Sequence, residues 1–251
     1  MPNFDNELQE YQNILFYTQE GNECRQYMQD RNILPKTAKY WNLGYCPINY
    51  TPTCYNDLSQ QKVNHFWKKL QGRLIIPIFD QNGKLISLSG RAIFKGMWPK
   101  YDHYPFPAKR TLFGLYQNKN NIRTENKSII TEGQLDVISA WQNDIRIVTS
   151  SFGAHAGIEH LALLGRYTNN IYIIYDSDDA GNRGTYSIKK LNKADLNIQF
   201  CNNLFPQGED MDNWVQNHTK NELYTLIETN TENTLKQQIS KLLNKKIVIT
   251  D

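Results

Sequence analysis

The chain has 251 residues, 39% of them hydrophobic and 21% charged, so it can bury a substantial core as one large domain or two smaller ones. No apolar run approaches the roughly 20 residues of a membrane-spanning helix, and the polar segment 1–5 is no signal peptide. The four cysteines lie far apart, with no Cys-x-x-Cys pair and no His at zinc spacing. These features argue against a membrane protein, a disulfide framework and a zinc site, and we expect a cytoplasmic chain with free thiols.

The net charge of +3 is unevenly distributed along the chain. Residues 62–123 hold twelve lysines and arginines against two aspartates, a local charge of +10, so the rest of the chain carries −7. This asymmetry indicates one part built for polyanions and another for cations. Aromatic residues interleave with the basic ones, a combination that suits single-stranded nucleic acid or nucleotides, the alternatives being a solvated face and core packing. The aromatic residues are Phe66, Trp67, Phe94, Trp98, Tyr101, Tyr104 and Phe106.

The first part of the chain predicts an α+β arrangement. Helices are expected over residues 6–31, 33–44 and 65–70, with Gly44 ending the second and a loop over 45–55. Two strands, 73–80 and 84–90, are expected to form a hairpin through the turn at residues 81–83. Pro77 within the first strand predicts a sheet edge or a bulge. An aromatic, proline-rich loop is expected from Trp98 to about Arg110.

From Ser128 onwards, short apolar runs alternate with helix-like segments. Strands are expected over residues 128–131, 145–150, 171–175 and 198–200, and helices over 132–143, 157–167 and 180–193. Alternation at this spacing predicts a parallel sheet with crossover helices. The polar tail from Asn217 is helix-prone and is expected to dock either on the body of the protein or on a partner.

Three pairs of acidic residues punctuate this second part. The pairs are Glu132 with Asp136, Asp176 with Asp178, and Asp210 with Asp212. The middle pair directly follows a strand that we expect to be buried on both faces, and its two side chains, two residues apart, point the same way. Open α/β sheets bind ligands at the carboxyl ends of their strands. Carboxylates that converge there repel one another unless a divalent cation neutralises them, and oxygen-only ligands favour Mg²⁺ or Mn²⁺.

Each pair also has an ordinary structural interpretation. The aspartates at 176, 178 and 212 can cap the helices that follow them. Glu132 in the first turn of a helix is favoured by the helix dipole, although Asp136 one turn later adds a like charge on the same face. The residues of any one pair leave both interpretations open, and the recurrence of three pairs at strand ends favours the metal site.

The acidic pairs lie in segments that resemble the three signatures of the Toprim domain, in the version found in bacterial replicative primases. These segments are TEGQLD at 131–136, YDSDDAG at 175–181 and FPQGEDMD at 205–212. Upstream, the segments 25–33, 43–45, 73–83, 90–91, 99–101 and 112–116 are similar, in order and spacing, to the basic amino-terminal part of that primase's polymerase core. The resemblance implies an α/β fold: a basic α+β subdomain (1–125), a Toprim parallel-sheet domain (126–217) and a short helical tail (218–251).

The activity implied by this resemblance is metal-dependent nucleotidyl transfer, making short RNA primers from ribonucleoside triphosphates on single-stranded DNA. The implied cofactors are two or more Mg²⁺ or Mn²⁺ ions, without zinc. By resemblance, Asp176, Asp178 and Asp210 hold metal with Asp136 and Asp212 nearby, and Glu132 is a ligand or the general base. The matching basic residues, which face phosphates and template, are Arg73, Arg91, Lys100 and Lys109. Tyr101, Arg110, Gly133 and Gly181 complete the expected binding set.

The sequence also departs from the family pattern. It has no Cys/His quartet for the family's amino-terminal zinc module, its region after the Toprim part is short, and Asp179 adds an acid where the family often has a basic or neutral residue. The expected partners are therefore single-stranded DNA, nucleotides, and a replicative helicase or a separate zinc-module protein, with no membrane. A host cytoplasm is expected if the protein is viral or encoded by a mobile element. The alternatives are a Toprim nuclease or strand-cleaving enzyme, and a non-catalytic single-strand-binding module.

Overall fold

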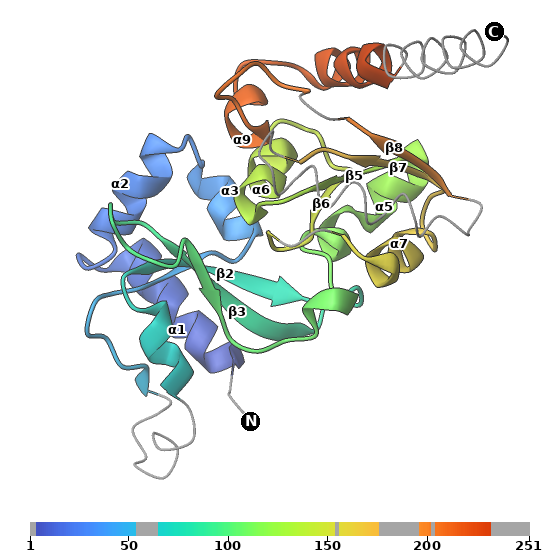
Figure 1. The fold of residues 1–251 in the computed structure, drawn as a ribbon. Coiled ribbons are helices and arrows are strands. Elements are labelled where there is room, and N and C mark those ends of the chain that lie inside the picture. The colour runs from blue at the N-terminus through green and yellow to red at the C-terminus, as the bar shows by residue number, and fades with distance from the viewer. Residues whose placement is uncertain (1–3, 54–64, 154–155, 176–195, 202–203, 232–251) are drawn as a thin grey trace, which may run out of the picture. The chain divides into compact units, whose positions relative to one another are not determined.

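The computed structural model describes residues 4–53, 65–153, 156–175, 196–201 and 204–231. The chain divides into two compact units, residues 1–116 and 117–251 (Figure 1). In the part of the chain that the structure describes, each unit has a four-stranded sheet. Within the described ranges, no helix is both long enough and apolar enough to cross a membrane.

The sheet of the first unit is antiparallel, with its strands in the order β1-β2-β3-β4. These strands are β1 (Gly44–Cys46), β2 (Arg73–Phe79), β3 (Leu85–Ala92) and β4 (Tyr101–His103). The predicted β2–β3 hairpin is confirmed, and Gly83 in its turn has φ +92°, a conformation that favours glycine. The short strands β1 and β4 were not predicted, because each lies beside prolines in a stretch with the composition of a loop.

Pro77 lies beside a register shift of β2, at a position that β1 does not reach. The strand β1 pairs only with residues 73–75 of β2, so at Pro77 the described chain offers β2 a partner on the β3 side alone. The register also shifts between Ile78 and Phe79, directly beyond the proline. The expectation of an edge or a bulge is therefore confirmed, since proline has no N–H to donate to a second neighbour.

The helices of the first unit begin with α1, which packs against the sheet. They are α1 (Phe4–Tyr17), α2 (Asn22–Asp30) and α3 (Pro35–Tyr40), with the 3₁₀ helices η2 (His65–Leu70) and η3 (Ala108–Arg110). Helical spacing correctly predicts the buried face of α1, but the helix expected over residues 6–31 is broken near Gly21. A Cβ on Gly21 would lie 2.3 Å from the carbonyl oxygen of Ile14, so only glycine fits this close approach.

Gly44 does not end the helix before it, contrary to the prediction. The helix α3 ends at Tyr40, and Asn42 takes the left-handed conformation with φ +55°. Gly44 instead belongs to β1, where a Cβ would lie 2.7 Å from the Cβ of Tyr11 on α1. The glycine thus permits close packing of α1 on the sheet.

The sheet of the second unit is parallel, in the order β6-β5-β7-β8, as the strand–helix alternation predicts. Its strands are β5 (Ser128–Thr131), β6 (Val148–Ser150), β7 (Asn170–Ile173) and β8 (Asn197–Phe200). The expectation that residues 171–175 form a strand buried on both faces is wrong in two respects. The strand ends at Ile173, and its burial alternates, with Ile171 and Ile173 buried and Tyr172 only partly so.

Within the described residues, four labelled helices and one further helical segment accompany this sheet. They are α5 (Leu115–Glu125), α6 (Gln134–Gln142), α7 (Ile158–Leu164), α9 (Met211–Trp214) and residues 220–231. The helix α6 packs against β6 and α9. The helix α5 was not predicted, and it is fixed by the buried Asn118, whose Nδ2 donates to the carbonyl oxygen of Val148 at 2.8 Å. The helix expected over residues 180–193 lies outside the described residues.

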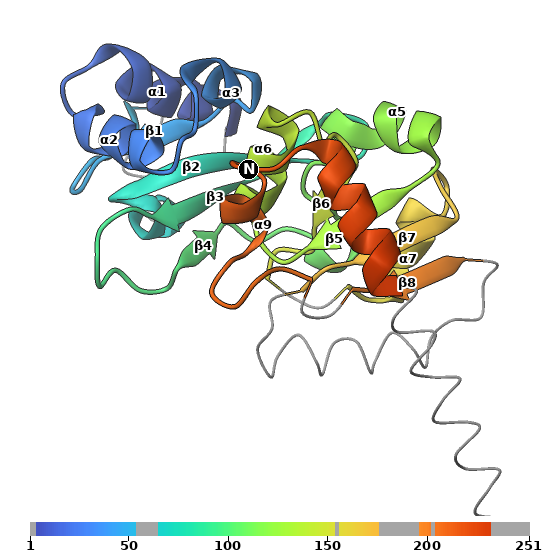
Figure 2. The same ribbon diagram turned by 90° about the horizontal axis from the view of Figure 1, so that it is seen from above.

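The described part of the tail docks on the second unit. In the helix of residues 220–231, drawn in red in Figure 2, Leu223 and Ile227 are buried. Lys220 Nζ lies 2.6 Å from Glu125 Oε1 at the end of α5. Of the two positions that the sequence leaves open for the tail, this segment therefore takes the one on the body of the protein.

Candidate functional site

The topology of the parallel sheet directs attention to the carboxyl ends of β5 and β7. The chain continues from β5 to β6 on one side, while β7 lies on the other side of β5. Such a reversal of strand order is the position at which open α/β sheets form a ligand-binding crevice. Ile130 pairs with Ile173, so the residues that follow them leave the sheet at the same end. The sequence segments that start with Thr131 and Ile174 therefore meet here.

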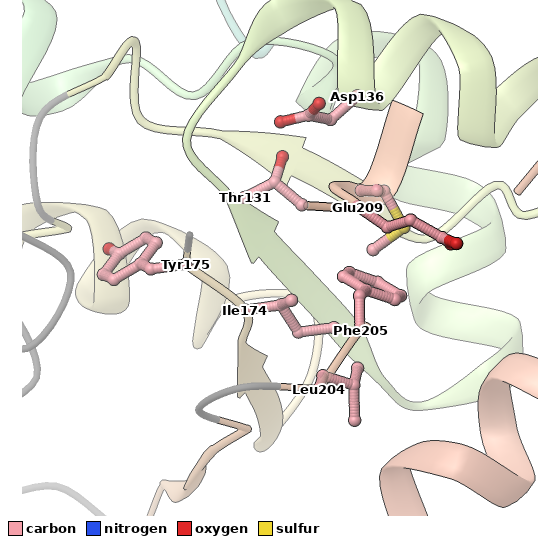
Figure 3. A pocket seen from close by; sticks show the side chains of 8 residues that line it. Thr131, Asp136, Ile174, Tyr175, Leu204, Phe205 and Glu209 are labelled. Atoms are coloured by element: carbon pink, nitrogen blue, oxygen red, sulfur yellow. The ribbon is translucent and has the colours of Figure 1, made fainter. Parts of the chain in front are cut away.

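A pocket open to solvent lies at this end of the sheet, and its empty space, open solvent included, is about 300 Å³. Its lining comes from three separate segments of the chain. The lining residues are Thr131, Asp136, Ile174, Tyr175, Leu204, Phe205, Glu209 and Met211 (Figure 3). Among the described lining residues, Asp136 and Glu209 carry carboxylates, and in Figure 3 the carboxylate of Glu209 points away from Asp136. All three segments belong to the predicted signatures, which the fold thus brings to one place.

Tyr175 connects this pocket to the middle acidic segment of the sequence. Its hydroxyl accepts a hydrogen bond from the backbone N–H of Ala156 at 2.7 Å, and burial raises its pKa, so the ring stays neutral. Asp176 is the next residue along the chain. Asp176, Asp178 and Gly181 lie outside the described residues, so their predicted roles stay predictions.

The sequence predicts Glu132 in the first turn of a helix, but the residue lies just before α6. The helix begins at Gln134 with Gly133 as its N-cap. The carbonyl oxygen of Glu132 accepts hydrogen bonds from Ser150 Oγ at 2.6 Å and from the Gly153 N–H at 2.7 Å. The backbone at Glu132 is therefore held by the residues at the end of β6 and just after it. Because Glu132 lies outside the first turn of α6, the helix-dipole interpretation of its carboxylate does not apply.

Asp136 and Gly133 close the amino-terminal end of α6 together. Asp136 Oδ2 accepts from the Gly133 N–H at 2.9 Å. A Cβ on Gly133 would lie 2.9 Å from the same oxygen, so glycine leaves room for this contact. Both residues were predicted at the site, and the structure gives each a role in forming the helix that follows Glu132.

The third acidic pair divides its two roles in an unexpected way. Asp210 is the N-cap of α9, and its Oδ1 accepts from the Asn213 N–H at 2.9 Å, whereas the sequence suggested Asp212 as the capping residue. Asp212 is only 2% exposed and accepts a hydrogen bond from the hydroxyl of Ser139 on α6. Asp212 therefore ties α9 to α6, and Asp210 is the more accessible carboxylate of the pair.

The chemistry of these donors fits a divalent cation bound through oxygen. Capping engages Oδ1 of Asp210 and fixes the orientation of its carboxylate, as hydrogen bonds to metal ligands commonly do. A set of Glu and Asp side chains without His or Cys suits Mg²⁺ or Mn²⁺ rather than zinc. Among the residues that the structure describes, no three His, Cys, Asp or Glu side chains gather as a metal-binding group. The acidic segment 176–179 lies outside the described residues, so its part in a metal site stays a prediction.

The two arginines predicted to face phosphates are buried in the first unit. Arg73 is 4% exposed, and its Nη1 donates to the carbonyl oxygen of Pro99 at 2.7 Å and to that of Gly90 at 3.4 Å. Burial lowers the pKa of its guanidinium. Gly90 leaves room for the side chain of Arg73, because a Cβ at position 90 would lie 2.7 Å from Cδ of Arg73. Arg73 thus anchors the chain that precedes β4.

Arg91 is also held by local partners. Its Nε donates to the hydroxyl of Tyr27 at 3.1 Å, and its guanidinium carbon lies 4.9 Å from the centre of the Tyr101 ring. Tyr101, predicted as a template-binding residue, is consequently partly covered by Arg91. The remaining predicted cations, Lys100, Lys109 and Arg110, are exposed to solvent, the last two in η3.

Two residues near the site were missed from the sequence. Glu209 lines the pocket and stands directly before Asp210 in the third signature, so its position in that acidic run could have identified it. Ser139 bonds to Asp212, but nothing in the pattern of α6 distinguishes it from any other buried serine. Only the packing of α6 on α9 reveals it.

Comparison with known proteins yields two family models in tandem. Residues 11–119 match the model for the DNA primase catalytic core, N-terminal domain, and residues 129–215 match a Toprim-like model. Among curated proteins, the DNA primase of Aquifex aeolicus (strain VF5) is 30% identical over 227 residues, covering 84% of this chain and 45% of the relative. The DNA primase of Legionella pneumophila is 28% identical over 241 residues, covering 88% and 41%. The chain thus spans less than half the length of these relatives.

Solved structures give the same result for the fold. The Aquifex aeolicus primase (zinc binding and RNA polymerase domains) matches with 28% identity and a TM-score of 0.76, covering 90% of this chain and 59% of that one. The structure titled as the DnaG primase catalytic domain bound to ssDNA matches with 24% identity and a TM-score of 0.77, covering 90% and 79%. With both family models in the same order as the sequence signatures, the chain belongs to the bacterial DnaG-type DNA primase family, of which it represents the catalytic core.

Proposed function

We propose that this chain is a primer-synthesising RNA polymerase, which joins ribonucleoside triphosphates on a single-stranded DNA template. The observation that carries the proposal is the convergence of three distant signature segments on one pocket at the carboxyl ends of β5 and β7. Nucleotidyl transfer needs charge stabilisation at a developing phosphoryl transition state, and a pocket rimmed by carboxylates is suited to hold the cations that provide it.

We assign phosphate binding to the basic first part of the chain and metal binding to the acidic second part. Residues 126–217 would form the metal-binding catalytic domain, residues 1–125 the nucleotide- and template-binding subdomain, and residues 218–251 a tail. The exposed Lys100, Lys109 and Arg110 can meet phosphates directly, whereas Arg73 and Arg91 would act by holding the strands and loops around them. The similarity to a DnaG catalytic domain solved with single-stranded DNA supports the template assignment.

For the second unit, we assign Asp176, Asp178 and Asp210 as the residues that hold two or more Mg²⁺ or Mn²⁺ ions. When bound, these ions would neutralise the negative charge that grows on the phosphoryl oxygens. Capping of α9 orients the carboxylate of Asp210, and Asp136 and Asp212 secure the helices on either side. Glu132, on a backbone fixed by the end of β6, would take the proton from the attacking 3′-hydroxyl or serve as a further ligand.

We infer two kinds of macromolecular partner beyond the template. A replicative helicase and a separate protein that carries a zinc module would direct the core to its start sites. Supplying a zinc-module protein to the priming assay tests this, and product that forms only in its presence places start-site selection in a second chain.

The proposal is tested by incorporation of labelled nucleotides on single-stranded DNA with Mg²⁺ or Mn²⁺. Replacing Asp176 by Asn, or Glu132 by Gln, is expected to lower product formation by at least about 100-fold, because each removes a charge at the reacting centre. Asp144→Asn is the matched control: this residue is exposed and has φ +62°, which Asn tolerates, so activity should be retained.

Unchanged product with Asp176→Asn would contradict the assignment. The same reaction without nucleotides separates polymerase from nuclease activity, because cleavage of the labelled strand under those conditions would favour a Toprim nuclease. Binding of DNA with neither product would favour a non-catalytic module.

A further inference from the structure

The first unit carries a tryptophan that its fold leaves in solvent. Trp98 is 86% exposed, the highest value among the exposed large hydrophobic residues of the described chain. It lies in the loop between β3 and β4. A single exposed apolar side chain is ordinary on a protein surface, so exposure alone assigns no role. The surroundings of Trp98 are what distinguish it.

The loop that presents Trp98 is anchored on its carboxyl-terminal side. The Ala92 N–H donates to the carbonyl oxygen of Lys100 at 3.0 Å, where β3 and β4 meet. The buried guanidinium of Arg73 holds the carbonyl oxygen of Pro99, the residue directly after Trp98, at 2.7 Å. A charged donor makes such a hydrogen bond stronger than a neutral one. The backbone that carries Trp98 is therefore held from within the unit.

The amino-terminal side of the loop is held by packing. The Met97 N–H donates to the carbonyl oxygen of Phe94 at 3.2 Å, and Gly96 has φ +82°, which forms a tight turn. The side chains of Met97 and Phe94 both lie against Gly72, where a Cβ would come within 2.8 Å and 3.4 Å of them. The loop thus packs the partly exposed Phe94 and Met97 against Gly72 and leaves the tryptophan in solvent.

The charges beside Trp98 are positive. Lys95 and Lys100 flank it in the sequence and are exposed, and neither has an ion-pair partner in the part of the chain that the structure describes. The nearest acid along the chain, Asp102, lies 3.9 Å from Lys69. An exposed aromatic ring with exposed lysines on both sides of it in the sequence suits single-stranded nucleic acid, because bases stack on the ring and phosphates meet the cations.

We propose that Trp98 is a stacking platform for an unpaired base of the single-stranded DNA template, with Lys95 and Lys100 on the adjoining phosphates. This inference rests on the proposed function, since it specifies how the template is held. One stacked base multiplies affinity by roughly 5- to 150-fold. That factor is too small to retain a free nucleotide, but it adds usefully to a strand already held by phosphate contacts. A duplex is excluded as the occupant, since its bases are stacked on one another.

Binding of a fluorescently labelled oligothymidylate to the full chain, followed by anisotropy, tests the proposal. Trp98→Ala should weaken binding by roughly 5- to 150-fold, and Trp98→Phe should retain part of the affinity. Tyr17→Ala is the matched control, because Tyr17 is 75% exposed in the same unit and should not alter binding. An abasic oligonucleotide of equal length offers phosphates without bases, so on this strand wild type and Trp98→Ala should bind equally.

The dependence on salt separates stacking from charge. Trp98→Ala should leave the slope of log affinity against log salt unchanged, whereas Lys95→Ala should reduce it by about 0.7, the value for one phosphate contact on a single strand. Equal affinity of wild type and Trp98→Ala for oligothymidylate would overturn the proposal. So would an equal loss on the abasic strand, or an effect confined to binding of ribonucleoside triphosphates in the absence of DNA.

Failure of this inference can be told apart from failure of the proposed function. Priming by the wild-type chain, with strand affinity independent of Trp98, would overturn only the stacking role. Strand binding that depends on Trp98 in a chain without priming activity would overturn only the polymerase.

Discussion

In the antiparallel unit, the two arginines predicted to act on phosphates are buried, whereas in the parallel unit the predicted Asp136 lines a pocket and Asp210 lies between two residues that line it. Arg73 and Arg91 are buried and donate to a backbone carbonyl and to a tyrosine hydroxyl. Asp136 and Asp210 also accept hydrogen bonds from backbone N–H groups, but they lie at the ends of helices beside or near solvent. The comparison shows that some residues of a functional signature have a structural role: they stabilise the elements around the site.

The two units also differ in how a structural role limits function. Arg73 is only 4% exposed, so its guanidinium affects a ligand indirectly, by positioning the loop that carries Trp98. A capping carboxylate engages one oxygen with the backbone and can bind a cation through the other. We therefore expect the arginines of the first unit to act by positioning, and the acids of the second unit to combine structure with direct chemistry.

The largest expected effect separates these two roles at Asp210. Asn caps a helix as well as Asp does, but it carries no charge for a metal ion. Asp210→Asn should therefore preserve thermal stability and lower priming by at least about 100-fold, while Asp210→Ala should lose the same activity and about 1 kcal/mol of unfolding free energy. Parallel priming assays and denaturant titrations measure both quantities. Full activity in Asp210→Asn would reduce this residue to a cap.

The next effect concerns the anchor of the first unit. Arg73→Ala leaves the carbonyl oxygen of Pro99 without its donor and opens space beside Gly90, so the free energy of unfolding should fall by about 2–3 kcal/mol. Arg73→Met keeps the apolar stem and isolates the lost hydrogen bond, so it should fall less. Urea denaturation followed by circular dichroism measures the change. The exposed Lys36→Ala should stay within about 0.5 kcal/mol of wild type, and an equally small change in Arg73→Ala would refute the anchoring role.

A smaller effect is expected where α6 meets α9. Asp212→Ala removes the acceptor of the Ser139 hydroxyl and should lower the free energy of unfolding by about 1–3 kcal/mol. Ser139→Ala should lower it less, because only a hydroxyl group is removed, although the buried carboxylate of Asp212 then has one donor fewer. The double variant should be more stable than the sum of the two losses predicts. Additive losses in this double-mutant cycle would show that the two side chains do not interact.

The smallest effect is a dependence on pH in the first unit. Burial lowers the pKa of His103 below its ordinary 6.5, with Arg73 nearby lowering it further and Asp102 opposing the shift. The neutral ring is thus favoured in the folded state, so its stabilisation is present above pH 6.5 and is lost as the pH falls through the lowered value. His103→Gln should flatten the decline in unfolding free energy between pH 7 and 5. An unchanged decline would assign the pH dependence to other groups.

The elements best predicted from the sequence are those whose signal is local. The β2–β3 hairpin follows from Gly83 and the apolar runs on either side, and the parallel sheet follows from regular strand–helix alternation. The strands β1 and β4 and the helix α5 were missed, because their residues carry no strong periodicity and are stabilised by neighbours distant in the sequence. The division of labour between Asp210 and Asp212 was likewise invisible, since it depends on where α9 begins.

The amino-acid sequence by itself determined the family, the order of its signatures and the side chains available for chemistry, because residue types and spacings are written along the chain. Only the tertiary structure decided which of those side chains are buried supports and which face solvent. Arg73 passes over Gly90 to hold Pro99, and Ser139 meets Asp212, through contacts between residues 17 to 73 positions apart. Burial and hydrogen-bond partners depend on such long-range packing, which no local pattern specifies.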